Sequence, residues 1–167
     1  MRDPILVYHA GSQVSRFRFL LYFSLACFGA AIIGFYWIAF VVEDSDLPNQ
    51  ERWLLALIVL TVGAAFFGGM LIYSHRYVVW LWTDDKLREV KIETMALFGE
   101  REQHFRIEDF ASVDYDSGEM ITRYHRIRTP YFKLRVSGQR LPYVIDLQGY
   151  ISEQALFERL LATLSPK

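Results

Sequence analysis

The side chains of this chain that could ligate a metal or attack a substrate are few and widely separated. No HExxH is present, and no GxSxG, Walker loop or GxGxxG follows an expected strand. One thiol cannot form an internal disulfide. We therefore expect neither enzyme activity nor a metal or cofactor, a bound phospholipid such as cardiolipin excepted. The histidines and the cysteine considered are His9, His75, His104, His125 and Cys27.

Two clusters of charge could nevertheless bind something. The acids Glu43, Asp44 and Asp46 could hold a cation, although a solvated loop is the better explanation for them. The segment TRYHRIR could contact anionic lipid or an acidic patch on a partner, or its arginines could form the outward side of an ordinary strand. The candidate residues of that segment are Arg123, His125, Arg126 and Arg128.

Two long apolar runs place these clusters beside a membrane. Residues 19–42 and 53–73 contain no charged side chain, and each run exceeds the roughly 20 residues that a helix needs to cross a bilayer. The mean hydropathy is +0.15, high for a soluble chain of this size. The acidic VVEDSDLPNQ that follows the first run lacks the small-residue cleavage site of a signal peptide. We predict transmembrane helices over 19–42 and 53–75, joined by an acidic loop over 43–52.

The positive charges predict the orientation of this hairpin. Arginine and lysine occur before the first run and after the second, whereas the loop has only Arg52 beside four acids. Cytoplasmic or matrix loops carry such an excess, so both termini should lie on the side from which insertion occurs. We expect His75 and Arg76 at the lipid headgroup level. The expected contacts to lipid or a partner are Arg16, Arg18, His75 and Arg76.

Small residues recur every four positions on both expected helices. Residues at this spacing allow close backbone approach, either within the hairpin or to a helix of another protein. Glycine and alanine are also frequent in membrane helices for no such reason. The expected packing residues are Ala26, Ala30, Gly34, Ala64, Gly68 and Gly69.

The remaining residues, 76–167, have the pattern of a small β domain. Two strand-like runs flank the turn at 83–86, and 104–116 supplies another strand. Apolar and polar residues alternate over 131–136 before a turn at 137–139, which predicts a hairpin. Leucine and phenylalanine then recur at helical spacing over 156–164. The expected fold is α+β: a transmembrane hairpin, residues 1–18 as a separate N-terminal segment, and an antiparallel, pleckstrin-homology- or GRAM-like domain closed by an amphipathic helix.

Three short patterns resemble the transmembrane protein 70 family of small mitochondrial inner-membrane proteins, from about Asp3 to the end of the chain. They are the entry DPILVYH, the HR after the second run, and a late L-x-V-x-G-x-R…Y-x-x-D-x-x-G. The residues of the late pattern are Leu134, Val136, Gly138, Arg140, Tyr143, Asp146 and Gly149.

This resemblance implies an inner-membrane protein with both termini in the matrix. By this resemblance, family members assist biogenesis of respiratory-chain complexes or ATP synthase, and one member that this chain resembles is tied to cytochrome c oxidase. The first 19 residues are a poor match to an import presequence, which is rich in arginine and serine and poor in acids.

Two functions follow as expectations. The first is a non-catalytic accessory subunit or assembly factor of a respiratory complex, with membrane subunits as partners; cytochrome c oxidase comes first, and complex I, complex III and ATP synthase are alternatives. The second is a lipid-binding or regulatory membrane protein that binds anionic lipid through its β domain. A net charge of −1 gives no basic excess for nucleic acid, and no motif indicates a small-molecule substrate.

Overall fold

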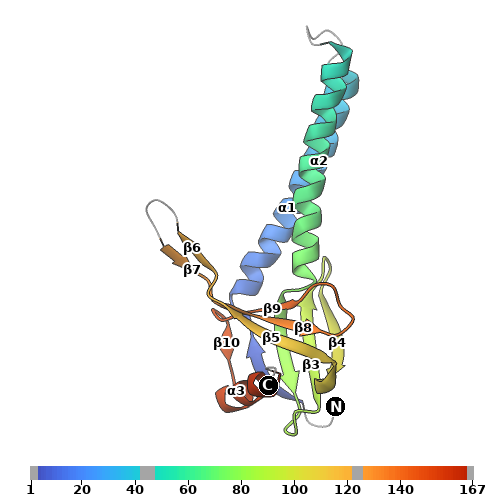
Figure 1. Ribbon diagram of the computed structural model, residues 1–167. Helices are drawn as coiled ribbons and strands as arrows, with labels where there is room; N and C mark the ends of the chain where they lie inside the picture. Colours follow the sequence, from blue (N-terminus) through green and yellow to red (C-terminus); the bar gives the residue numbers. More distant parts are fainter. Residues whose placement is uncertain (1–3, 42–47, 122–125, 165–167) are drawn as a thin grey trace. The chain divides into compact units, whose positions relative to one another are not determined.

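The computed structural model describes residues 4–41, 48–121 and 126–164 (Figure 1). They form two compact units. One unit is the helical hairpin, Phe17–Tyr73, and the other combines Met1–Arg16 with Ser74–Lys167. The N-terminal residues, expected to be a segment of their own, therefore belong to the β domain.

The hairpin consists of α1 (Gln13–Tyr36), which continues as a π-helical turn η1 (Trp37–Val41), and α2 (Asn49–Ser74). Both helices are long and apolar enough to cross a membrane. Large apolar side chains, including Phe19, Ile33 and Val62, are exposed along both helices. A helix in the core of a soluble protein would bury such side chains, whereas in lipid they are stable where they lie.

The two helices contact each other along a narrow seam. Leu21, Ser24 and Ala31 are buried on α1 at spacings of three and seven residues, as in a coiled-coil seam. On α2 the facing residue is Gly63: a Cβ placed there would lie 2.5 Å from the Cβ of Ala31. The methyl group of Ala31 therefore packs against the Gly63 backbone, and only a glycine there allows this close approach.

Aromatic pairs also join the two helices. Phe28 stacks on Phe67 with ring centroids 5.6 Å apart. Toward the loop, Trp53 contacts Phe40 at 5.4 Å, and at the opposite end Phe17 contacts Tyr73 at 5.1 Å. Such pairs stabilise the contact beyond simple burial of area.

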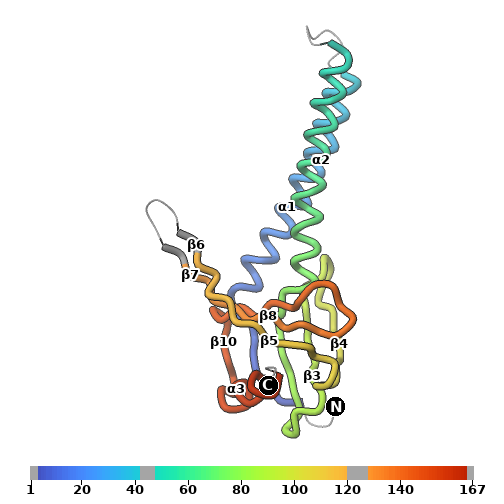
Figure 2. Tube along the Cα trace, viewed as in Figure 1, coloured from blue at the N-terminus to red at the C-terminus, as the bar shows by residue number. Residues whose placement is uncertain are grey.

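The β domain contains two main antiparallel sheets and a two-stranded arm. The five-stranded sheet has the order β10-β1-β2-β3-β4, the three-stranded sheet the order β5-β8-β9, and β6 pairs with β7 alone (Figure 2). The strands are β1 (Ile5–His9), β2 (Val78–Thr83), β3 (Glu89–Met95), β4 (Glu100–Arg106), β5 (Phe110–Asp116), β6 (Glu119–Ile121), β7 (Arg126–Arg128), β8 (Tyr131–Val136), β9 (Tyr143–Asp146) and β10 (Tyr150–Ile151).

Strand β1 was absent from the sequence-based expectation. It lies between β2 and β10, with Tyr8 opposite Leu81 and His9 opposite both Trp80 and Tyr150. The apolar run ILVY suits a strand, but both of its partners come after the hairpin in the sequence, so no local pattern indicates the pairing. The transmembrane hairpin is thus inserted between two adjacent strands of one sheet.

The expected single strand over 104–116 is instead the end of β4, a short 3₁₀ turn η2 (Ile107–Asp109) and β5. The Asp109 carboxylate accepts a hydrogen bond from the Arg106 backbone N–H at 2.8 Å. This turn moves the chain from the first sheet to the second. Phe105 and Phe110, on its two sides, meet at 5.8 Å.

The late hairpin and the C-terminal helix are confirmed. β8 and β9 flank a turn in which Gly138 takes φ +78°. The helix α3 (Gln154–Leu164) buries the predicted apolar stripe, and its Phe157 contacts Phe132 of β8 at 6.2 Å. The fold is therefore α+β, with antiparallel sheets and a C-terminal helix after the apolar helices.

Candidate functional site

Two of the sequence motifs, the entry DPILVYH and the late D-x-x-G, meet around Tyr8. Its side chain is fully buried, and its hydroxyl donates a hydrogen bond to the Asp146 carbonyl oxygen at 2.8 Å. Gly149 lies against the ring, because a Cβ there would be 2.5 Å from Cε2 and from the hydroxyl oxygen. Only glycine leaves room for the ring. The pattern D-x-x-G therefore anchors β1 to the end of β9.

The HR motif is anchored in the same domain. The guanidinium carbon of Arg76 lies 5.1 Å from the centroid of the Tyr143 ring, and Arg76 donates a hydrogen bond to Gln139. The Val144 N–H donates to the Arg76 carbonyl oxygen at 2.8 Å. His75 and Arg76 are half-buried. The structure thus gives Arg76 contacts within the protein, which sequence reasoning did not anticipate.

The small residues divide into two groups. Gly34 faces the other helix, since a Cβ there would lie 3.6 Å from Cγ1 of Val59. A Cβ at Gly68 or Gly69 would meet no atom of the described chain within 4 Å. Among the expected packing residues, those exposed at the hairpin surface are Ala26, Ala30, Ala64 and Gly69. The hairpin therefore uses Gly34 for its own contact and leaves small residues of both helices facing outward.

Gly63, which lies against Ala31 of the other helix, was not among the expected packing residues. It stands seven residues after the buried Ala56 and four before Phe67, the heptad spacing of a seam. That spacing is the pattern in the sequence from which Gly63 could have been predicted as a packing residue.

The basic candidates are placed only in part. Arg16 is exposed and Arg18 half-buried. Arg123 and His125 lie outside the described residues, as do the loop acids Glu43, Asp44 and Asp46. Arg126 belongs to β7, and Arg128 at the other end of that strand lies 3.5 Å from Glu119 on β6.

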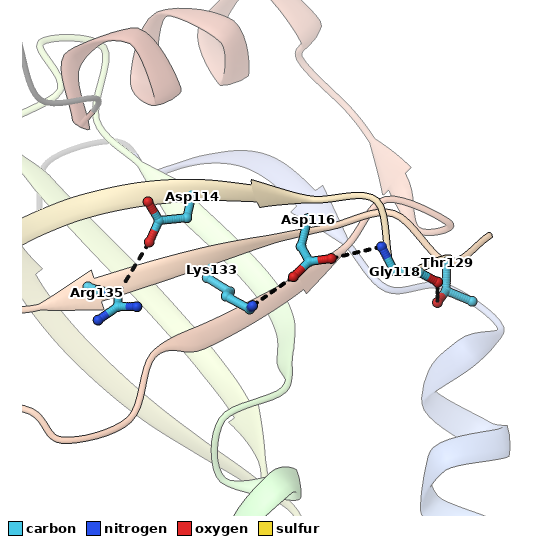
Figure 3. A network of polar contacts seen from close by, with 6 residues as sticks. All are labelled: Asp114, Asp116, Gly118, Thr129, Lys133 and Arg135. Carbon is cyan, nitrogen blue, oxygen red and sulfur yellow. Dashed lines mark hydrogen bonds and ion pairs between the residues drawn. The ribbon is translucent and has the colours of Figure 1, made fainter. Parts of the chain in front are cut away.

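A polar clasp holds the base of the β6–β7 arm (Figure 3). Asp116 accepts hydrogen bonds from the Lys133 ammonium at 2.8 Å and from the Gly118 N–H at 2.9 Å. Thr129 donates its hydroxyl to the Gly118 carbonyl oxygen at 3.2 Å. Gly118 takes φ +53°, and a Cβ there would lie 2.8 Å from the Thr129 hydroxyl oxygen. Both the backbone conformation and this close contact require glycine at position 118.

The clasp predicts a pH dependence. The hydrogen bond from Lys133, then that from Gly118, lowers the pKa of Asp116 from 3.8 to about 2. Since the folded-state pKa lies below the unfolded value, the stabilisation is present above pH 3.8 and is lost as the pH falls toward about 2. Asp116→Asn should therefore flatten the decline of the melting temperature across this window. An unchanged pH profile in this variant would show that the clasp does not contribute.

Within the described part of the chain, no three side chains of histidine, cysteine, aspartate or glutamate come together as a metal site. The arrangement brings together surfaces and structural contacts. The features that the structure does present are exposed small residues on the helices, basic side chains and the faces of the sheets.

The comparisons with known proteins give one result. A family model described as the TMEM70/TMEM186/TMEM223 protein family matches residues 3–163. A search of curated proteins finds no match.

Proposed function

The chain belongs to the TMEM70/TMEM186/TMEM223 protein family, and from this premise we propose that it is a non-catalytic accessory subunit or assembly factor of a mitochondrial respiratory-chain complex. Cytochrome c oxidase is the first candidate because the resemblance points there, and complex I, complex III and ATP synthase follow. The mechanism is scaffolding: the hairpin binds membrane helices of a core subunit, and the β domain covers a surface of the same complex.

The observation that carries the proposal is an outward small-residue surface on α2, formed by Ala64 and Gly68 four residues apart. The hairpin's own seam lies at Ala31 and Gly63, whereas Ala64 is exposed and a Cβ at Gly68 would meet no atom of the described chain within 4 Å. In lipid there is no hydrophobic drive to cover such residues, and their use is close approach of another helix.

The sheet supports the topology of this proposal. Because β1 and β2 pair directly, the residues before and after the hairpin belong on one side of the membrane. The arginines and lysines flanking the hairpin favour the matrix side. We accordingly propose an inner-membrane location with both termini in the matrix.

Gly68→Leu tests the scaffold. The change stays apolar but blocks close approach, so membrane insertion should persist while recovery of the partner complex falls about tenfold, as for a central interface residue. Gly63→Leu is the matched comparison, because it fills the internal seam and should open the hairpin itself. The readouts are resistance to carbonate extraction and co-purification through a tag. Undiminished co-purification of Gly68→Leu would count against helix contact at this surface.

A lipid-binding or regulatory protein is the second candidate. It is favoured by the exposed Arg16 and by β7, where Arg128 keeps most of its side chain in solvent. Anionic lipids such as cardiolipin attract such charges. This function predicts that the chain binds anionic vesicles and has no stoichiometric protein partner.

A further inference from the structure

One face of the five-stranded sheet is turned away from the domain core. On β4, Gln103 and Phe105 point toward the second sheet, where both contact Tyr143. Side chains alternate along a strand, so Glu102 and His104 lie on the opposite face, called here the outer face. The register aligns its residues in two rows across the strands. These rows are Tyr150, His9, Trp80, Glu93 and Glu102, and beside them Leu6, Trp82, Lys91 and His104.

One half of the outer face is aromatic. The His9 ring lies 5.1 Å from that of Tyr150 and 5.3 Å from that of Trp80, and Trp80 stacks on Trp82 at 6.4 Å. Tyr150 is 61% exposed, and the two tryptophans are partly exposed. Rings gathered on an outward sheet face are typical of binding surfaces, because tryptophan and tyrosine dominate the affinity of protein interfaces.

The other half is acidic. Glu93 and Glu102 share one lysine, Lys91, at 2.8 and 3.0 Å. The hydrogen bond from Lys91, followed by that from His104, lowers the pKa of Glu102, so its carboxylate is charged at neutral pH. Two carboxylates therefore face one ammonium group, and this half keeps an excess of negative charge.

We propose that the outer face binds an arginine- or lysine-bearing loop of a partner polypeptide. A cation placed over the Trp80 ring is attracted by the ring face and stands next to Glu93 in the same row. The face already holds one cation in this way, since the Lys91 ammonium lies 5.9 Å from the centroid of the Trp82 ring.

This inference rests on the proposed function and names the chemistry of the partner. Membrane subunits carry their lysine and arginine in short loops on the insertion side, the side proposed for this domain. An anionic lipid headgroup would instead be repelled by the excess carboxylate. The second sheet offers no such excess among its ion pairs, because Asp114 pairs with Arg135 and Asp116 with Lys133 (Figure 3).

The test is photocrosslinking of the full chain in native membranes. Tyr150 is replaced by the photoreactive benzoylphenylalanine, and the crosslinked peptides are sequenced by mass spectrometry. The same replacement at Tyr115 on β5, which is also 61% exposed, is the matched control. Expected is a crosslink from position 150 to a loop with arginine or lysine near the crosslinked residue, and a different product or none from position 115.

Two charge variants complete the test. Glu93→Gln and Glu102→Gln are nearly isosteric, and each should lower the yield from position 150 about threefold or more. A crosslink to lipid alone, to a loop without basic residues, or with a yield that neither variant changes overturns the inference. If the chain comigrates with a respiratory complex but one of these overturning crosslinking results is found, the inference about the outer face fails and the proposed function stands.

Discussion

Gly149→Ala should unfold the β domain at a markedly lower temperature. Gly149 has no positive φ, so the cost is steric: the added methyl group would overlap the buried ring of Tyr8. Overpacking of a core costs about 1–3 kcal/mol, and a displaced hydroxyl also weakens its bond to Asp146, worth about 1 kcal/mol. A loss of roughly 2–4 kcal/mol should lower the melting temperature by about 10 °C or more, measured by thermal unfolding in detergent.

A double-mutant cycle shows whether the ring causes this loss. Tyr8→Leu removes the distal ring atoms that the new methyl group would meet. Tyr8→Leu with Gly149→Ala should therefore be clearly more stable than the sum of the two single losses. Strict additivity would mean that the destabilisation does not come from the Tyr8 contact.

Val7→Asp should prevent stable folding of the domain. Val7 is fully buried in β1, and its carbonyl oxygen accepts the Ser152 N–H at 2.9 Å. A carboxylate placed there without a partner costs several kcal/mol, comparable to the whole stability of a small domain, about 5–15 kcal/mol. Limited proteolysis of the full chain should then cut within residues 76–167, far from the substitution in sequence.

Ser12→Asp is the control for this experiment. Ser12 lies in the same N-terminal segment, is exposed, and precedes the first residue of α1, where aspartate is favoured as a helix cap. It adds the same charge and should leave the proteolytic pattern unchanged. Resistance of Val7→Asp to the protease would contradict the placement of β1 inside the sheet.

The elements that the sequence predicts are those with a local signal. The two apolar helices, the hairpin around Gly138 and the stripe of α3 each repeat a period within a short window. β1 has no such signal, because its partners Leu81 and Ile151 are separated from it by the whole hairpin or more. Pairing of this kind follows from the tertiary fold alone.

The sequence indicated which kinds of contact the candidate site makes, but not which residues make them. Small residues occur on several faces of both helices, so the sequence indicated close helix packing without identifying the packed face. In the structure the helices pack at the face of Gly63, beside the ring pair of Phe28 with Phe67. Arg76 was placed from its position after the apolar run. Its partner Tyr143 belongs to the late hairpin, and no spacing links the two in the sequence.

The most direct test of the scaffold function is the behaviour of the wild-type chain in native membranes. Gentle detergent extraction, blue-native separation and mass spectrometry of each band would show what the chain is bound to. For the scaffold function we expect comigration with a respiratory complex, with cytochrome c oxidase first: near-equal stoichiometry for an accessory subunit, or a trace on precursor bands for an assembly factor. Migration alone, at the size of a monomer or dimer, would contradict it and favour the lipid-binding function.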